Sequence, residues 1–395
     1  MEIHAANQFM WKIAYRLVRE YAYTVLHSDS DSIHLMRHKG RSSQYVQLRL
    51  CDFLWGATVH NYLEETAARL EGIRQQIGVR TVKGFVVFIM RQPFLGAAEE
   101  TVHKQPGIDE LGISLSPAAY VPEERQWVTG GQYTSAESAI LERLFTETTV
   151  SETDPPAPFW ANEIEQWEIR KQREIEAVFF YGKPRVTYVF LILIATVFIL
   201  MELSGGSQNM DVLISFGAKY NPLIQAGEWW RFITPIFLHI GFMHILFNGM
   251  ALHSLGTLTE QLYGPIRFFF IYMAAGICGV TASYVFSPNL SAGASGAIFG
   301  LFGSLLYFGT QNRQLFYRTL GSNVLFVLGI NLVIGFLYPN VIDNFAHLGG
   351  LFGGFLSSAV AGMPGRPRQP GQKLGAAALL LFLLWIGMQS GGWQP

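Results

Sequence analysis

Residues 293–308 read GASGAIFGLFGSLLYF, an uncharged and mostly apolar run with Ser295 near its start. A run of this kind is typical of a helix that crosses a membrane. Residues 345–362 form a second such run, and His347 lies near its start. Polar side chains inside spanning helices are costly and are usually retained for function. The two runs therefore indicate a serine and a histidine that share one depth in a bilayer.

Charge divides the chain into two parts. Of its 28 Lys+Arg and 29 Asp+Glu residues, 20 and 24 precede residue 186, which is typical of a soluble domain followed by a membrane domain. The formal net charge of −1 excludes an electrostatic nucleic-acid binder. Cys51 and Cys278 fall in different parts and in no metal-binding spacing. The N-terminus lacks the basic and apolar regions of a signal peptide, so the first part is expected to remain on the side where it is made.

Seven apolar segments predict a multi-pass α-helical membrane protein with seven transmembrane helices, preceded by a small α+β soluble domain. The predicted domains are a cytosolic domain at 1–155, a linker with a juxtamembrane amphipathic helix at 156–184, and a membrane domain at 185–390. Pro155-Pro156-Ala157-Pro158 marks the first boundary. The segments are 186–201, 243–262, 268–285, 294–308, 324–337, 345–362 and 374–388.

Basic residues concentrate in alternate loops between these segments. Because cytoplasmic loops carry such an excess, the N-terminal domain is predicted to be cytoplasmic and the C-terminus extracellular, in the plasma membrane. On this topology Ser295 and His347 lie at the outer ends of their helices, as do His244 and Asn248. The predicted orientation rests on the basic residues Arg170, Lys171, Arg173, Lys183, Arg185, Arg267, Arg313, Arg318, Arg366, Arg368 and Lys373.

Ser295 and His347 are the candidate nucleophile and base. A hydroxyl becomes a good nucleophile when a neighbouring base, most often histidine, takes its proton. Small residues alone are more often helix packing than a catalytic site. Here, however, they line one face of each helix, so the two helices can approach to backbone contact and bring the imidazole to the hydroxyl. These faces are Gly296, Gly300 and Gly303 on one helix and Ala346, Gly350 and Gly354 on the other.

His244 and Asn248 are four residues apart, so both project from one face of a helix. Together with the backbone N–H of Ser295 they can donate hydrogen bonds to the oxyanion of a tetrahedral intermediate. The alternative is that they are polar contacts between helices. His239, His244 and His347 could also be read as a metal site, but no Asp, Glu or Cys lies near them at the required depth. Asp343 is expected to cap a helix N-terminus, which leaves a Ser/His dyad.

These residues together resemble the rhomboid intramembrane serine proteases. The resemblance covers roughly residues 186–388 and, with seven helices, is closest to the bacterial six-plus-one type with an N-terminal cytosolic domain. The motifs that carry it are Gly293-Ala294-Ser295-Gly296, Ala346-His347 with Gly350 and Gly354, His239 with His244 and Asn248, Trp230-Arg231, and Gly256, Glu260 and Gly264.

The resemblance implies that Ser295 is the nucleophile, that His347 is the base, and that His244, Asn248 and the Ser295 amide bind the oxyanion. It implies structural roles for Arg231, in a membrane-dipping loop, and for Glu260, in an intracellular turn. One position departs from some relatives, because Phe299 stands where a tyrosine follows the serine by one turn. A phenyl ring can pack beneath the imidazole but cannot donate a hydrogen bond.

The predicted function is a serine endopeptidase without a cofactor, cleaving transmembrane proteins near the outer boundary of the bilayer. A segment that unwinds easily is the expected substrate, and the resemblance to rhomboid proteases implies a small residue before the cut. The first alternative is a catalytically inactive relative that binds membrane clients, but such proteins tend to lack the catalytic serine or histidine. A transporter is the second, and it would need polar positions at several depths.

The soluble part is expected to hold strands at 45–50 and 82–90 and helices at 55–77 and 159–180. Its dense polar cluster suggests either a weak divalent-cation site or a solvated turn between strands. The turn is favoured because no coordination spacing is met. Docking of a cytosolic regulator is suggested by position alone. The cluster consists of His27, Asp29, Asp31, His34 and His38.

Overall fold

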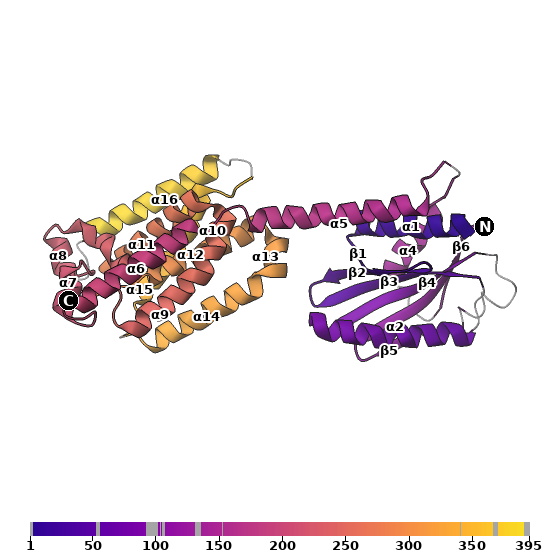
Figure 1. Cartoon of the computed structure of the whole chain (residues 1–395), viewed down its shortest axis with the longest axis horizontal. Helices are drawn as coiled ribbons and strands as arrows, with labels where there is room; N and C mark the ends of the chain where they lie inside the picture. Colours follow the sequence, from indigo (N-terminus) through magenta and orange to yellow (C-terminus); the bar gives the residue numbers. More distant parts are fainter. Residues whose placement is uncertain are drawn as a thin grey trace. The chain divides into compact units, whose positions relative to one another are not determined.

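The computed structural model describes residues 3–52, 56–91, 102, 104, 107–130, 136–151, 153–339, 341–365 and 370–390. The chain divides into two compact units, Met1–Arg173 and Glu174–Pro395 (Figure 1). Arg366 and Arg368, which contributed to the predicted orientation, lie outside the described residues.

The first unit is built on one mixed β-sheet. Its strands follow the order β1-β2-β3-β4-β6-β5, and β7 pairs with β6. β2 and β3 pair antiparallel, whereas β3, β4 and β6 run parallel, with α2 as the crossover between β3 and β4. The predicted strands at 45–50 and 82–90 lie within β3 and β4. The strands are Thr24–Ser28, Ser32–Lys39, Ser42–Cys51, Thr81–Met90, Ile108–Glu110, Ile113–Val121 and Gln126–Thr129 for β1 to β7.

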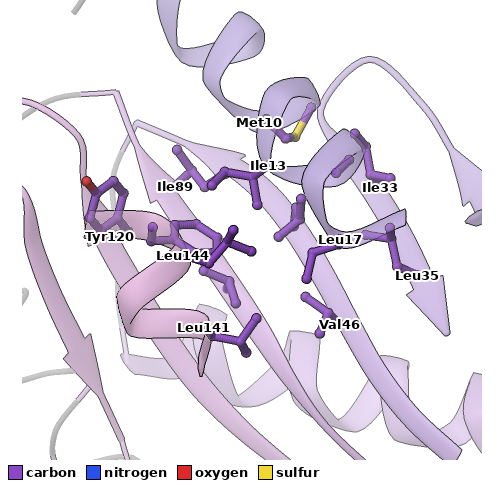
Figure 2. Packing of buried hydrophobic residues seen from close by; sticks show 14 of the residues in the cluster. Met10, Ile13, Leu17, Ile33, Leu35, Val46, Ile89, Tyr120, Leu141 and Leu144 are labelled. Carbon is purple, nitrogen blue, oxygen red and sulfur yellow. The ribbon is translucent and has the colours of Figure 1, made fainter. Parts of the chain in front are cut away.

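Helices cover both faces of this sheet (Figure 1). α1 (Ile3–Tyr21) and α4 (Ala136–Glu147) pack on one face and α2 (Gly56–Ile77) on the other. Because both faces are covered, β4 carries apolar residues at successive positions instead of alternating with polar ones. Figure 2 shows Met10 and Leu17 of α1 and Leu141 of α4 beside sheet residues such as Val46.

The second unit is helical in the described residues, apart from one isolated β-bridge. Its elements are α5 from residue 174 onward (the helix as a whole is Ala157–Phe179), α6 (Arg185–Leu203), α7 (Met210–Ser215), α8 (Asn221–Gln225), the 3-10 turns η1 (Trp229–Phe232) and η2 (Thr234–Phe237), α9 (Phe242–Ala251), the π segment η3 (Leu252–Gly256), α10 (Thr257–Tyr263), α11 (Pro265–Phe286), α12 (Ser295–Gln311), α13 (Arg313–Thr319), α14 (Gly321–Leu337), α15 (Asn344–Ala361) and α16 (Pro370–Gln389).

α12 forms the centre of this unit, since 13 of its 17 residues are buried. It packs against both α11 and α15, which also pack against each other, while α6, α14 and α16 form an outer, more exposed set. The outer helices expose large apolar side chains, among them Ile192 of α6, Phe326 of α14 and Leu381 of α16. A soluble protein would bury such residues, so this surface suits a hydrocarbon environment.

Each of the seven predicted apolar segments is helical. Among the described helices, α6, α11 and α16 are long and apolar enough to cross a membrane by themselves. α13 and α14, bent by 71° at their junction, make a fourth if the pair counts as one span. α12 and α15 have 17 and 18 residues, and α9 and α10 are joined through a π segment. The count of seven spans therefore stays a prediction.

Candidate active site

Ser295 is the first residue of α12. The segment directly before it is held by hydrogen bonds to the loop that precedes α9. Gly293 has φ +145°, a conformation that favours glycine, and its N–H donates to the Pro235 carbonyl at 2.9 Å. The next N–H, of Ala294, points to the His239 Nε2 at 3.4 Å. The N–H groups of a helix's first turn have no partner within the helix. The backbone around Ser295 is thus fixed, with N–H groups available for a ligand.

The predicted glycine faces of α12 and α15 meet at backbone distance. A Cβ placed on Gly350 would overlap the carbonyl oxygen of Gly296, and one on Gly354 would overlap that of Gly300. α11 closes the third side, where a Cβ on Gly279 would lie 2.7 Å from the Ala346 carbonyl oxygen. The neighbours of Ser295 and His347 are therefore in contact, as expected from small-residue faces.

His347 lies in the first turn of α15, which Asp343 caps. The Asp343 carboxylate accepts the Ala346 N–H at 3.0 Å and a short hydrogen bond from the Ser283 hydroxyl of α11. This confirms the predicted N-cap. With both carboxylate oxygens engaged, Asp343 is occupied as a cap and as an anchor to α11.

The imidazole of His347 stacks on Phe299, with ring centroids 4.0 Å apart and planes at 12°. Phe299 is one turn after Ser295 on α12, so the stack places the imidazole against the turn that carries the hydroxyl. The Nδ1 of His347 is buried and without a hydrogen-bond partner among the described residues. The ring is thus oriented mainly by packing, as the phenyl in place of a tyrosine led us to expect.

His244 and Asn248 lie on α9 beside the serine segment. A Cβ on Gly293 would lie 2.8 Å from the His244 Nε2, which locates this imidazole next to the turn before Ser295. His244 Nδ1 accepts the Ile240 N–H at 3.3 Å. With Nδ1 as the acceptor, Nε2 is the atom that carries the proton. The Asn248 amide donates one hydrogen bond to the His244 carbonyl at 3.0 Å, which leaves its second N–H for another partner.

Arg231 is buried in the loop between α6 and α9, whereas Trp230 is exposed. The Arg231 guanidinium donates to the carbonyls of Ile214 and Ala218, both at 2.9 Å, and pairs with Glu228 at 2.6 Å. These contacts join α7 to the turn η1 and give Arg231 a structural position in the loop.

Glu260 of α10 is fully buried and caps the N-terminus of α6. Its Oε1 accepts the N–H groups of Arg185 and Val186, and its Oε2 accepts the N–H and the hydroxyl of Thr187, all within 2.7–2.8 Å. A carboxylate is well placed there because a helix N-terminus carries free N–H groups and partial positive charge. The following Gly264 has φ +81°, so the turn into α11 also requires a glycine.

The N-terminal polar cluster spans the β1–β2 hairpin, with Asp29 and Asp31 in the turn, His27 on β1, and His34 and His38 on β2. Asp29 accepts hydrogen bonds from the N–H groups of Asp31 and Ser32 and from the Ser32 hydroxyl. Burial alone would raise the pKa of Asp29, but these bonds hold it below its usual value. Burial also lowers the pKa of His34 to about 4, and its Nδ1 is bonded to the Tyr45 hydroxyl at 2.6 Å.

Asp31 pairs with Arg91 and His38 bonds the Ser43 hydroxyl, while His27 contacts the ring of His34. Within the described ranges no group of three His, Cys, Asp or Glu side chains is arranged to hold a metal ion. Asp29 and Asp31 thus lie in a turn between strands, whereas His34 is buried on β2, and the choice between a cation site and a solvated turn stays a prediction.

Comparison with known proteins identifies the family of this chain. A model of the rhomboid domain matches residues 226–364. The rhomboid protease GluP of Bacillus subtilis (strain 168) is 39% identical over 396 residues, which is 96% of this chain and 74% of the relative. The chain belongs to the rhomboid family. This rhomboid protein also resembles the putative rhomboid protease YdcA of the same organism, at 41% identity over 35% of this chain and 70% of that relative.

A further relative, rhomboid-like protease 1 of Toxoplasma gondii, is 38% identical over 37% of this chain and 51% of its own length. Family membership makes the chain a membrane protein of the rhomboid proteases, which act within the membrane on transmembrane substrates.

Two residues that position the site of this rhomboid protease escaped prediction from sequence. Ser283 anchors Asp343, and Lys219 holds the segment before Ser295. Ser283 looks like any small residue of a membrane helix. Lys219 had a signal, because it is one of only two basic residues in the otherwise acidic loops that are predicted to lie outside, but its partners are main-chain carbonyls that no sequence pattern reveals.

Proposed function

We propose that this rhomboid protein is a serine endopeptidase in which Ser295 and His347 act as a catalytic dyad. The observation that carries the proposal is the backbone contact of α12 and α15 at Gly296 and Gly350, with the His347 ring stacked on Phe299 one turn from the serine. This arrangement supports a hydroxyl and an imidazole within reach of each other at the start of two central helices.

The chemistry follows from the groups present. The imidazole of His347 takes the proton of the Ser295 hydroxyl as its oxygen attacks the scissile carbonyl carbon. The developing oxyanion accepts hydrogen bonds from the Ser295 N–H, the His244 Nε2 and the free N–H of Asn248. Protonated His347 then gives its proton to the leaving amine. Water, activated by the same imidazole, hydrolyses the acyl-enzyme and restores the hydroxyl.

The positive end of the α12 dipole favours this oxyanion as well, because Ser295 is the first residue of that helix. The His244 imidazole can lie next to the serine segment because residue 293 is a glycine, and any side chain there would collide with the ring. These contacts support an oxyanion site formed by three donors from two helices next to the serine oxygen.

We place cleavage near the outer boundary of the plasma membrane, with the N-terminal domain in the cytoplasm and the C-terminus outside. The alternating basic loops support this orientation. A helix encloses its peptide bonds in i→i−4 hydrogen bonds, so a substrate segment that unwinds readily is the favoured target. An inactive client-binding role is disfavoured, since both the serine and the histidine are present.

A covalent probe tests the dyad. An activated serine oxygen attacks the phosphorus of a fluorophosphonate and displaces fluoride. Such a probe should label the purified protein, and peptide mass spectrometry should place the adduct on Ser295. Ser295→Ala and His347→Ala should abolish labelling. Ser304→Ala is the matched control, because Ser304 lies on the same helix and its hydroxyl donates to the Leu301 carbonyl of that helix. Labelling that survives in Ser295→Ala contradicts the proposal.

A further inference from the structure

Lys219 is a buried cation that the proposed chemistry leaves unused. It lies in the turn between α7 and α8 and has no exposed surface. Burying an ammonium group is unfavourable unless its three donors find acceptors. Here the Nζ donates to two main-chain carbonyls, those of Ser287 at 2.6 Å and Asn289 at 2.9 Å.

Those carbonyls belong to the segment that joins α11 to Ser295. Ser287 is the C-cap residue directly after α11, where carbonyl groups lack helical partners and a cation is favourable. The main chain of Lys219 adds a two-way bridge to Ser291, with N···O distances of 2.9 and 3.1 Å. Lys219 therefore contacts residues 287, 289 and 291, which are the alternate positions leading toward the nucleophile.

Asn221 reinforces the same attachment. Its side-chain amide donates to the carbonyls of Tyr284 and Ser287 at 3.2 and 3.3 Å. Beyond Ser291 the segment is held again, by the Gly293 N–H on the Pro235 carbonyl. The chain between α11 and α12 is thus fixed at both ends by the loop that precedes α9, and no regular secondary structure shapes it in between.

We propose that Lys219 is a positioning residue for Ser295, which it serves by holding residues 287–291 against the loop. The proposal rests on the proposed function of Ser295. Displacements of about 1 Å at a catalytic group can lower a rate by about 100-fold, so loss of the anchoring ammonium should slow acylation in molecules that are still folded. A residue that only stabilises the fold would instead reduce the number of active molecules.

The test measures rate and active fraction separately on the full-length protein. Fluorophosphonate labelling is followed to its end point in the parent, Lys219→Met and Ser295→Ala. Lys219→Met, which keeps the length but removes the donors, should lower the second-order labelling rate at least tenfold and leave the final labelled fraction unchanged. With a transmembrane substrate, kcat should fall by a similar factor and KM should change less than twofold. Where Lys219→Met does not fold, Lys219→Arg, whose planar head cannot take the Nζ position, is measured by the same criteria.

Ser215→Ala supplies the matched control in the loop, since the Ser215 hydroxyl bonds only the nearby Val212 carbonyl. It should label at the parent rate. A Lys219 variant with the parent's labelling rate, with or without a lower end point, overturns the inference, and so does equal slowing by Ser215→Ala. Rapid labelling of Ser295→Ala would instead overturn the proposed function, which keeps the two failures distinct.

Discussion

Replacing Glu260 with glutamine should strongly destabilise the membrane unit. The carboxylate accepts four hydrogen bonds in a fully buried site at the start of α6. Glutamine keeps one carbonyl oxygen for Arg185 and Val186. Its amide group then faces the Thr187 N–H, donor against donor. The Thr187 hydroxyl can rotate to accept a hydrogen bond from this amide group, but the main-chain N–H of Thr187 is left without a partner.

The magnitude follows from these changes. A hydrogen bond to a charged acceptor contributes about 1 kcal/mol more than one to a neutral acceptor, and the two bonds at Oε1 each lose this amount. The Thr187 N–H, buried and left without a partner, costs about 1–3 kcal/mol more. The expected loss is about 4 kcal/mol in the free energy of unfolding. For a unit of this size that corresponds to a fall of roughly 8–16 °C in melting temperature.

Thermal unfolding in detergent, followed by helical circular dichroism, measures this fall. Glu174→Gln is the matched control, because it removes the same charge from an exposed position in the same unit. It should melt within about 2 °C of the parent. If Glu260→Gln also melts that close to the parent, the capping role assigned to this carboxylate is wrong.

Three further changes test other parts of the structure. Gly350→Ala forces the backbones of α12 and α15 apart and should lower cleavage at least about tenfold, whereas Gly329→Ala, on an open face of α14, should retain activity. Phe299→Leu removes the stack on His347, worth about 0.5–1.5 kcal/mol, so kcat should fall roughly 2- to 13-fold with KM unchanged; an unchanged kcat would contradict the role of the stack. His34, whose pKa burial lowers to about 4 from an unfolded value of 6.5, should make the first unit less stable as pH falls between these values, by at most about 3 kcal/mol. In urea unfolding of the full chain, His34→Gln should flatten that dependence, and an equally steep variant would contradict it.

Local chemistry made the central contacts predictable from sequence. Glycines at helical spacing on α12 and α15 have few roles other than close packing, and Gly296 and Gly350 meet as expected. Asp343 directly before an apolar helix has the residue type and position of an N-cap, and it caps α15. In both cases a spacing of a few residues carries the physical constraint, so no knowledge of the fold is needed.

Other features depend on contacts between distant residues. Glu260 is recognisable as a costly buried carboxylate, but its partners at the start of α6 are more than 70 positions earlier. Lys219 and Ser283 likewise find partners 60 or more residues away. The main-chain acceptors of Lys219 carry no side-chain signature, and the Asp343 carboxylate that Ser283 contacts is 60 residues away, so such pairs follow only from the assembled helices. The number of spans depends on another feature, because α12 has only 17 residues and α9 and α10 are joined through a π segment.

Cleavage of a single-span membrane substrate in reconstituted vesicles is the most direct test of the central claim. The parent protein and Ser304→Ala should cleave it within the span or at its outer boundary, and Ser295→Ala and His347→Ala should leave it intact at equal amounts of folded protein. Cleavage by Ser295→Ala at the parent rate would contradict the assignment of this serine as the nucleophile.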